Sequence, residues 1–179
     1  MAKSDSFFIR AVVTSNDTTY AQAEIDLGSF VNLGVKSSTL LRIHNVQVSI
    51  RDTDFPASIS KNDGQACIAY QLCTQSQTAI VGYDDKSVVA AGHMQMYPGL
   101  QEADGTAAGD FKTVFATNDF DLNPSEFKNG YLVGVDSLFL GTDMSVQLTS
   151  GNVDVGIILE CTLESATQAT ATALALSQQ

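Results

Sequence analysis

The two histidines are the residues of this chain best suited to chemistry. His44 and His93 each lie in a stretch that alternates between apolar and polar residues. A metal-dependent enzyme needs two or three imidazoles and a carboxylate close together, because an open metal site takes that many protein ligands. The sequence has no His-x-His pair and no third histidine. We expect both side chains to make ordinary hydrogen bonds, although a site built from His44, His93 and a carboxylate stays geometrically open.

The sequence gives no better support for a catalytic nucleophile that is activated by a neighbouring base. The chain has no G-x-S-x-G elbow, phosphate loop or Rossmann glycine pattern, and its many serines give only chance pairings with histidine. A glycosidase needs two opposed carboxylates, and no feature of the sequence specifically indicates such a pair. The three cysteines, Cys67, Cys73 and Cys161, are too few for a disulfide framework, so we expect buried free thiols in a reducing cytoplasm. The sequence predicts a protein that is not an enzyme.

Closely spaced aspartates are the remaining candidates for a ligand site. The pairs are Asp52 and Asp54, Asp84 and Asp85, and Asp119 and Asp121. Carboxylate oxygens suit Ca²⁺, but none of the pairs follows the twelve-residue EF-hand pattern. We expect solvated turn and capping residues, with loop Ca²⁺ left open and no other cofactor.

The charge balance points away from nucleic acid and toward self-packing. The net charge is −11, from 20 acidic against 9 basic residues, and only Lys3 and Arg10 are basic near the N-terminus. Nucleic-acid binding depends on clustered Lys and Arg, so no direct contact with a genome is expected. Charged residues make up 16% of the chain, against roughly 25% in typical soluble domains. Uncharged polar surface loses less on desolvation, which favours packing against copies of the same chain.

Strand periodicity runs through almost the whole chain. The segment "LLRIHNVQVSIRD" (Leu40–Asp52) shows it best, with apolar residues at alternate positions. The alternation slips by one residue near His44 and Asn45, which predicts a β-bulge that lets a long strand bend between two sheets.

Further strands are predicted at regular intervals, separated by turn-rich clusters. They are Phe7–Ser15, Tyr20–Gly28, Gln65–Cys73, Ser87–Met96, Phe111–Asp119, Gly130–Gly141, Met144–Ser150 and Val153–Ser165. The last two, separated by Gly151 and Asn152, form a predicted hairpin with a two-residue turn. About eight antiparallel strands favour an all-β protein with a single jelly-roll sandwich over an immunoglobulin-like one, whose core Trp is missing.

The two ends of the chain are predicted to be assembly arms. We divide the chain into a sandwich over residues 1–165, including an N-terminal arm, and a C-terminal arm over residues 166–179. Phe7, Phe8 and Ile9 are the expected contact residues of the first arm. The last fifteen residues, "SATQATATALALSQQ", carry no charge and fit a short helix or an extended arm, with Leu174 and Leu176 as anchors. Ordering them costs roughly 1–2 kcal/mol per residue, so we expect packing on a neighbouring subunit, with packing on the same subunit as the alternative.

Taken whole, the chain resembles single-jelly-roll viral capsid proteins. It is most similar to the small major capsid proteins of tailless icosahedral viruses of archaea or bacteria that contain an internal membrane. Strands such as "LLRIHNVQVSIRD" and "GYLVGVDSLFLG" carry this resemblance over Phe7–Ser165, in general form and without a diagnostic motif. The resemblance implies pentameric or pseudo-hexameric clustering, and partners among other capsid proteins and the membrane.

These observations lead to one main hypothesis and two alternatives. The main hypothesis is a self-assembling capsid subunit of a virion, assembled in the host cytoplasm, because the sequence shows no secretory signal and no apolar span. The first alternative is a surface filament subunit that donates Phe7–Ser15 to the next copy. The second is a lectin-like spike or fibre head that binds sugars through tyrosines beside its loops.

Overall fold

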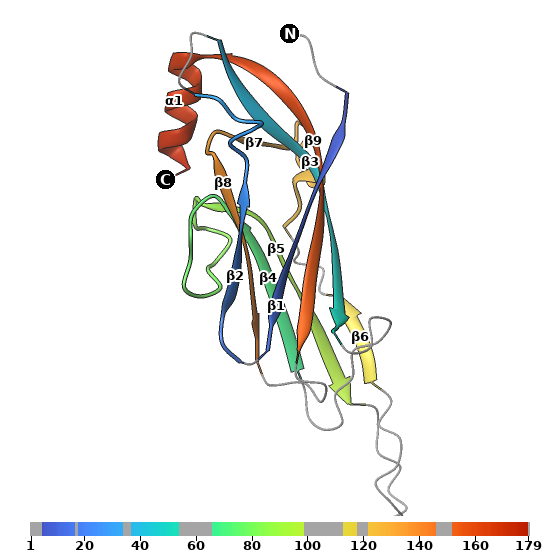
Figure 1. Ribbon diagram of the computed structural model, residues 1–179. Coiled ribbons are helices and arrows are strands. Elements are labelled where there is room, and N and C mark those ends of the chain that lie inside the picture. The colour runs from blue at the N-terminus through green and yellow to red at the C-terminus, as the bar shows by residue number, and fades with distance from the viewer. Residues whose placement is uncertain are drawn as a thin grey trace, which may run out of the picture.

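A computed structural model shows a two-layered β-sandwich with one helix at its end (Figure 1). It describes residues 5–16, 18–33, 37–53, 66–98, 113–117, 122–145 and 152–178. The first sheet has the strand order β1-β9-β3-β7, and the second has the order β2-β8-β4-β5-β6. All of the pairings between these strands are antiparallel.

The elements follow one another closely along the described chain. The first sheet contains β1 (Phe7–Ser15), β3 (Ser37–Asp52), β7 (Tyr131–Val133) and β9 (Val153–Thr167). The second contains β2 (Ala21–Asp26), β4 (Ala66–Cys73), β5 (Val88–Pro98), β6 (Thr113–Thr117) and β8 (Ser137–Met144). A 3₁₀ turn, η1 (Pro124–Glu126), precedes β7, and the helix α1 (Gln168–Ser177) follows β9.

The pairing of the strands is that of a jelly roll. The first strand pairs with the last (β1 with β9), the second with the second to last (β2 with β8), and β3 with β7, while β4 and β5 form the inner hairpin. A long antiparallel hairpin folded over on itself gives this nesting, with each consecutive pair divided between two sheets. The predicted fold class, an all-β jelly roll of about eight strands, is confirmed. The short β6 is an addition at the edge of the second sheet.

The longest pairing joins β3 to β9 and contains the predicted bulge. Ser37 lies opposite Thr167 and Asp52 opposite Val153, and the register shifts between Ile43 and Asn45. The bulge keeps Leu41, Ile43 and Val46 all in the core in spite of the change of parity. The expected bend between two sheets is wrong, because β3 stays paired with β9 on both sides of the bulge.

The inward faces of both sheets form one main apolar core, with a small second cluster around Cys73, Val88 and Ala91. From the first sheet the main core takes alternate residues of β9, namely Val153, Val155, Ile157, Leu159 and Cys161. The second sheet contributes Ile68 and Leu72 from β4 and Leu138 and Leu140 from β8, all nearly inaccessible to solvent. Strict alternation along β9 makes its even-numbered residues face outward.

Two sequence-based predictions in the last third of the chain are wrong. The expected strand Gly130–Gly141 is divided into β7 and β8, which belong to different sheets. The chain turns at Gly134–Asp136, where the carbonyl of Asp136 accepts a hydrogen bond from the Leu27 amide at 2.7 Å. The predicted hairpin is absent as well, because β8 pairs with β2 and β4 whereas β9 pairs with β1 and β3. Residues 146–151 of that prediction lie outside the described residues.

Two consecutive residues, Leu122 and Asn123, connect the two sheets along one side of the sandwich. Leu122 forms a backbone bridge with Ala91 of β5, with N···O distances of 2.7 and 3.0 Å. The Asn123 side chain pairs with β3 as a neighbouring strand would: its amide nitrogen donates to the Val46 carbonyl at 2.8 Å, and its oxygen accepts from the Val46 amide at 3.2 Å. The same oxygen accepts from the Ser125 amide at 3.1 Å and so caps η1. This dipeptide therefore links the edges of both sheets.

We predict that Asn123→Ala destabilises the sandwich by about 1–3 kcal/mol, because the buried Val46 amide and carbonyl lose their partners. Urea denaturation followed by circular dichroism measures the difference. Asn129→Ala is the matched control, since Asn129 lies in the same connection and is exposed. Equal losses of stability in the two variants would contradict a linking role for Asn123.

Candidate assembly interface

Neither histidine belongs to a carboxylate cluster in the part of the chain that the structure describes. His44, at the bulge of β3, has its Nε2 2.9 Å from the Thr162 hydroxyl. His93, on β5, lines a cleft of about 260 Å³ together with residues of β3 and β4, and its Nε2 lies 3.2 Å from the Gln95 amide nitrogen. Within the described ranges no three His, Cys, Asp or Glu side chains come close enough to hold a metal ion. The expectation of ordinary hydrogen bonds is confirmed for both residues.

The described cysteines and aspartates occupy ordinary structural positions. Cys73 and Cys161 are buried and Cys67 is half-buried, all as free thiols. Among the aspartate pairs, Asp84 and Asp85 are described in full, and Asp85 accepts hydrogen bonds from the Ser87 amide and hydroxyl at 2.8 and 2.7 Å. These bonds lower the pKa of the Asp85 carboxyl, as expected of a turn-capping aspartate.

Asp52 is buried at the end of β3. Its predicted companion Asp54, and the pair Asp119 and Asp121, lie outside the described residues. Loop Ca²⁺ therefore stays a prediction.

The three N-terminal residues predicted to form an arm are part of the sandwich instead. Phe7, Phe8 and Ile9 begin β1, which is paired with β9 along its whole length. Phe7 and Ile9 pack against the core, and the ring of Phe7 stacks on Phe30 with centroids 5.1 Å apart. Phe8 points the other way and is 56% exposed. A role in assembly stays a prediction for these residues, and Phe8 is the one that faces outward.

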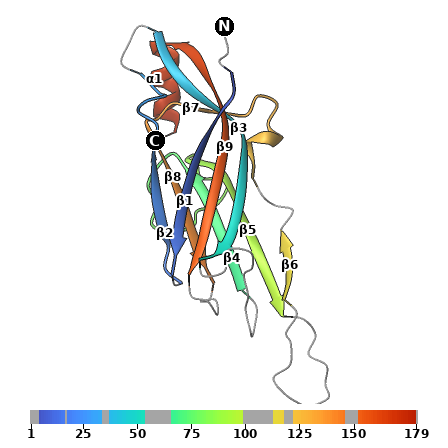
Figure 2. The same ribbon diagram turned by 45° about the vertical axis from the view of Figure 1, so that its right-hand side comes forward.

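The C-terminal residues form helix α1, which packs on its own subunit. Figures 1 and 2 both show it beside the ends of β3 and β9 that lie farthest from β6. Thr167 caps the helix, and Ala171 is fully buried. Leu174 packs so closely on Gly134 that a Cβ atom added there would lie 3.0 Å from the leucine side chain. The described helices include none long and apolar enough to cross a membrane.

Gln178 fixes the end of the helix. Its side-chain oxygen accepts from the Gly134 amide at 2.8 Å, and its side-chain nitrogen donates to the Leu132 carbonyl at 2.6 Å. Its backbone carbonyl accepts from the Thr74 hydroxyl at 2.7 Å. The residue is only 4% exposed.

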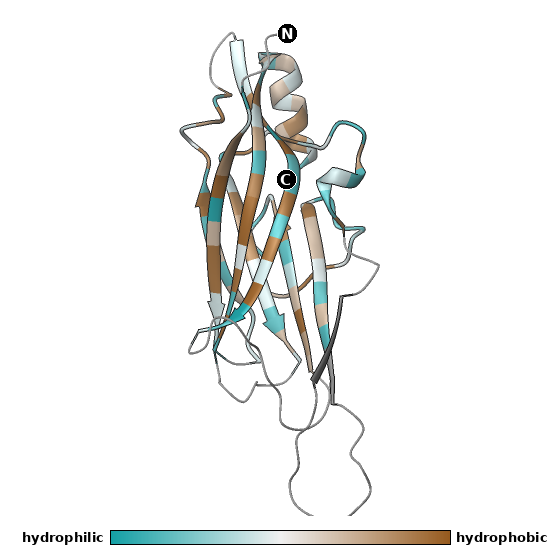
Figure 3. Ribbon diagram, turned by 90° about the vertical axis from the view of Figure 1, so that its right-hand side faces the viewer, coloured by the Kyte–Doolittle hydropathy of each residue, from teal (hydrophilic) through white to brown (hydrophobic). Residues whose placement is uncertain are grey.

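The structure thus corrects the expectation that the tail needs a neighbouring subunit, because these contacts order it within one chain. Leu176 is 67% exposed, and α1 carries no charged residue. Figure 3 shows most of the helix in white to brown shades, which mark residues of intermediate to high hydropathy. A role in assembly for Leu174 and Leu176 stays a prediction.

The outer surface of β1, β9 and β3 combines exposed apolar side chains with an ion pair. We call it the β1-β9-β3 face. It is built from cross-strand rows, which the register gives as Arg10 beside Ile158 and Gln47, Val12 beside Gly156 and Ser49, and Thr14 beside Asp154 and Arg51. Phe8 lies beside Glu160 at its end.

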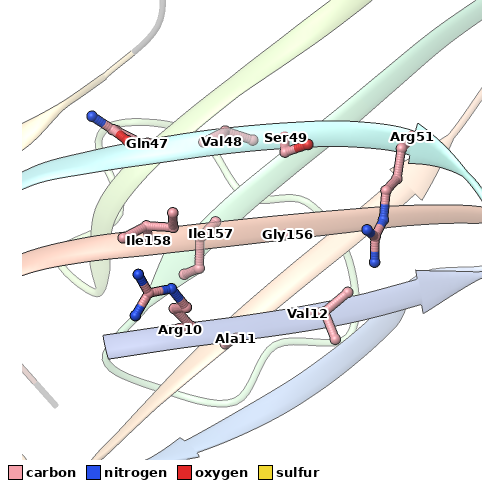
Figure 4. Close-up of a pocket in the computed structure, with 10 residues that line it drawn as sticks. All are labelled: Arg10, Ala11, Val12, Gln47, Val48, Ser49, Arg51, Gly156, Ile157 and Ile158. Atoms are coloured by element: carbon pink, nitrogen blue, oxygen red, sulfur yellow. The ribbon is translucent and has the colours of Figure 1, made fainter. Parts of the chain in front are cut away.

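A shallow groove of about 310 Å³ runs over the middle of this face. Gly156 forms its floor, because the central strand has no side chain there while Val12 and Ser49 rise on either side (Figure 4). Val12 is 49% exposed, so the groove has an apolar wall. Phe8 and Val12 are two of the five large apolar side chains that are exposed within the described ranges.

The charges on this face cancel, in contrast with the acidity of the chain. Arg51 pairs with Asp154 at 3.2 Å, and the Thr14 hydroxyl donates to the same carboxylate at 2.6 Å. Arg10 and Glu160 supply one further charge of each sign. The guanidinium of Arg10 lies 6.0 Å from the centre of the Phe8 ring, and Arg10 forms no ion pair with any described residue. A neutral, partly apolar face is inexpensive to desolvate and is suited to contact with another protein.

The sequence carries a signal for this face in the outward residues of β1. Phe7, Ile9 and Val13 supply the inward apolar set, yet Phe8 and Val12 on the opposite parity are apolar too. A strand with apolar residues on both faces indicates that both faces are covered. The groove itself could not be found in this way, because it depends on Gly156 lying between Val12 and Ser49.

We predict that only Cys67 reacts with a thiol reagent near pH 8 in the folded protein. Burial raises the pKa of Cys73 to about 11 and that of Cys161 to about 12, so both stay protonated. Burial also raises the pKa of Cys67, which should react slowly. Colorimetric titration should count one thiol in the folded protein, three in denaturant, and none in folded Cys67→Ser.

The same shifts give a pH dependence of stability. Unfolded thiols lose their protons from about pH 9 upward. The buried ones keep theirs until pH 11–12, so the free energy of unfolding should fall over that interval. In the thiol titration near pH 8, rapid labelling of a second thiol in the folded protein would contradict the burial of Cys73 and Cys161.

We predict that Gln178→Ala loosens the C-terminal helix and destabilises the protein by about 1–3 kcal/mol, because the Gly134 amide and the Leu132 carbonyl lose their partners. Thermal unfolding measures the loss, and limited proteolysis should cut the tail sooner. Gln168→Ala, at an exposed position of the same helix, is the control and should change neither result.

Comparison with known proteins finds likeness in structure alone. Neither the family models nor the curated proteins contain a match to the sequence. The structure is similar to VP1 of human polyomavirus 12 in complex with 3'-sialyllactosamine, with a TM-score of 0.46 and 8% identity over 91% of this chain and 100% of that chain. It is also similar to VP1 of New Jersey polyomavirus (TM-score 0.45, 8% identity, 91% and 100% covered) and to the unassembled VP1 pentamer of Merkel cell polyomavirus (0.40, 9%, 89% and 94%). Because these scores lie below 0.5, the assignment of the jelly roll rests on the strand order.

Proposed function

We propose that this chain is a structural protein, a jelly-roll subunit that assembles with copies of itself into a viral capsid. The observation that carries the proposal is the β1-β9-β3 face, which is electrically neutral and exposes Phe8 and Val12 in a chain with a net charge of −11. Contact through this face removes apolar surface from water without leaving a net charge buried.

The shape of the subunit supports a role in building a shell. Its faces are sheets held by a continuous core, so they are rigid platforms for side-to-side contacts. The jelly roll itself is shared by capsid proteins, lectins and enzymes, so the fold alone does not choose among them. The choice of a structural protein over an enzyme is supported by the isolation of His44 and His93 from any carboxylate cluster in the described chain.

The remaining parts of the proposal concern setting and partners. We place the subunit in a virion of a tailless icosahedral virus of archaea or bacteria, assembled in the host cytoplasm. Its partners are copies of itself, other capsid proteins and an internal membrane. Direct contact with nucleic acid is not expected, because acidic residues outnumber basic ones by 20 to 9.

The two alternatives have less support. A filament subunit would donate Phe7–Ser15 to its neighbour, but this strand already pairs with β9 of its own chain at every position. A lectin-like head would stack sugars on aromatic rings. Tyr83 is 47% exposed and could offer its ring to a sugar, whereas Tyr131 is half-buried on β7 and offers less of its surface.

We predict that the double variant Phe8→Ser, Val12→Ser folds but does not assemble. Both side chains point outward and about half of each is exposed, so the free energy of unfolding should change by less than about 1 kcal/mol. Light scattering and negative-stain imaging should show particles for the unmodified chain and single subunits or small clusters for the variant.

The control is Tyr83→Ser, Phe127→Ser, which removes two exposed aromatic side chains outside the face. It should assemble normally. A Phe8, Val12 variant that forms the same particles as the unmodified chain, or an unmodified chain that never assembles, would refute the proposed function.

A further inference from the structure

A second surface has the opposite character to the β1-β9-β3 face. It lies on β2, an edge strand of the other sheet. Ile25 of β2 points into the core, so Glu24 and Asp26 point outward, and both are exposed. The register places Phe139 of β8 directly beside Glu24, and Phe139 is half-buried. We call this surface the β2 edge.

Among the described residues, the carboxylates of the β2 edge have only neutral partners. Glu24 accepts a hydrogen bond from the Ser137 hydroxyl at 2.7 Å, and Asp26 accepts one from the Gly28 amide at 2.7 Å. Within the described ranges neither of them forms an ion pair. The edge therefore keeps two negative charges that are not balanced by a cation.

The two surfaces are complementary in charge and in apolar content. On the β1-β9-β3 face, Arg10 forms no ion pair with a described residue and is flanked along the strand by Phe8 and Val12. On the β2 edge, Glu24 forms no ion pair in the described part of the chain and lies beside an aromatic ring. The positive charge of Arg10 between two apolar side chains is complementary to the negative charge of Glu24 beside an aromatic ring.

We propose that the β1-β9-β3 face of one copy docks on the β2 edge of the next, with Arg10 paired to Glu24. This inference rests on the proposed function, because it assumes that copies of the chain associate. Glu24 is the better partner because it lies in the middle of β2. Asp26 ends the strand, and its carboxylate holds the following turn through Gly28.

The contact has a consequence for symmetry. The two surfaces lie on different sheets of the sandwich, so the interface joins unlike surfaces head to tail. Such a contact forms a ring when the rotation between copies closes, and an open filament when it does not. A ring is the cluster from which a shell is built.

The test is a charge exchange within one chain. Arg10→Glu places like charges opposite each other and should raise the protein concentration needed for assembly at least tenfold. The double variant Arg10→Glu, Glu24→Arg restores an opposite pair at every contact, whatever the number of copies in the ring. It should assemble within about threefold of the unmodified chain, as measured by light scattering over a concentration series.

The control is the double variant Arg10→Glu, Glu126→Arg. It has the same net charge as the exchange variant, but its new arginine lies at the exposed Glu126 of η1. It should assemble as poorly as Arg10→Glu alone. Circular dichroism should show the same folded spectrum for all of the variants.

Each outcome separates the two proposals. If the unmodified chain does not assemble, the proposed function fails. If Arg10→Glu assembles normally, if the exchange variant stays dissociated, or if the control recovers as well as the exchange variant, then the pairing of Arg10 with Glu24 is wrong while the proposed function stands.

Discussion

The pairing of β9 with two neighbours is the constraint on which the rest of the structure depends. The last strand lies between the first strand and the longest one, so three distant parts of the chain form one sheet (Figure 2). Its odd-numbered residues, from Val153 to Cys161, build the core. Its even-numbered residues have to form the middle of the outer surface. One strand therefore sets both the stability of the sandwich and the shape of the face that we propose for assembly.

Alternation of apolar residues was sufficient to predict the fold class and even the bulge beside His44, because both follow from which residues must face inward. The same alternation gave a wrong prediction where one continuous pattern belongs to strands of two different sheets. Gly130–Gly141 reads as one strand, yet a turn at Gly134 divides it between two sheets, and only pairing with distant strands decides this. The same limit applies to the candidate face. The sequence identifies Phe8 as a contact residue, but the groove further along β1 lies between Val12, Gly156 and Ser49, which belong to three strands far apart in the chain.

The distribution of charge divides the molecule into unlike sides. Arg51 and Asp154 neutralise each other on the first sheet, while Glu24 and Asp26 on the second pair with no cation among the described residues. A chain with a large net negative charge repels its own copies at long range. Association is then favoured only in orientations that bring the neutral face forward. Acidity elsewhere on the surface thus contributes to the selectivity of contact as well as to solubility.

The anchoring of Gln178 has a consequence for the order in which the chain folds. Its partners come from two segments, Leu132 and Gly134 at the end of β7 and Thr74 directly after β4, and neither segment supplies all of the bonds alone. The last turn of α1 can therefore take its final position only after both sheets have formed, so the attachment of Gln178 is a late step of folding. An opening of the β7–β8 turn breaks the bonds of Gln178 to Leu132 and Gly134 and so detaches the end of α1.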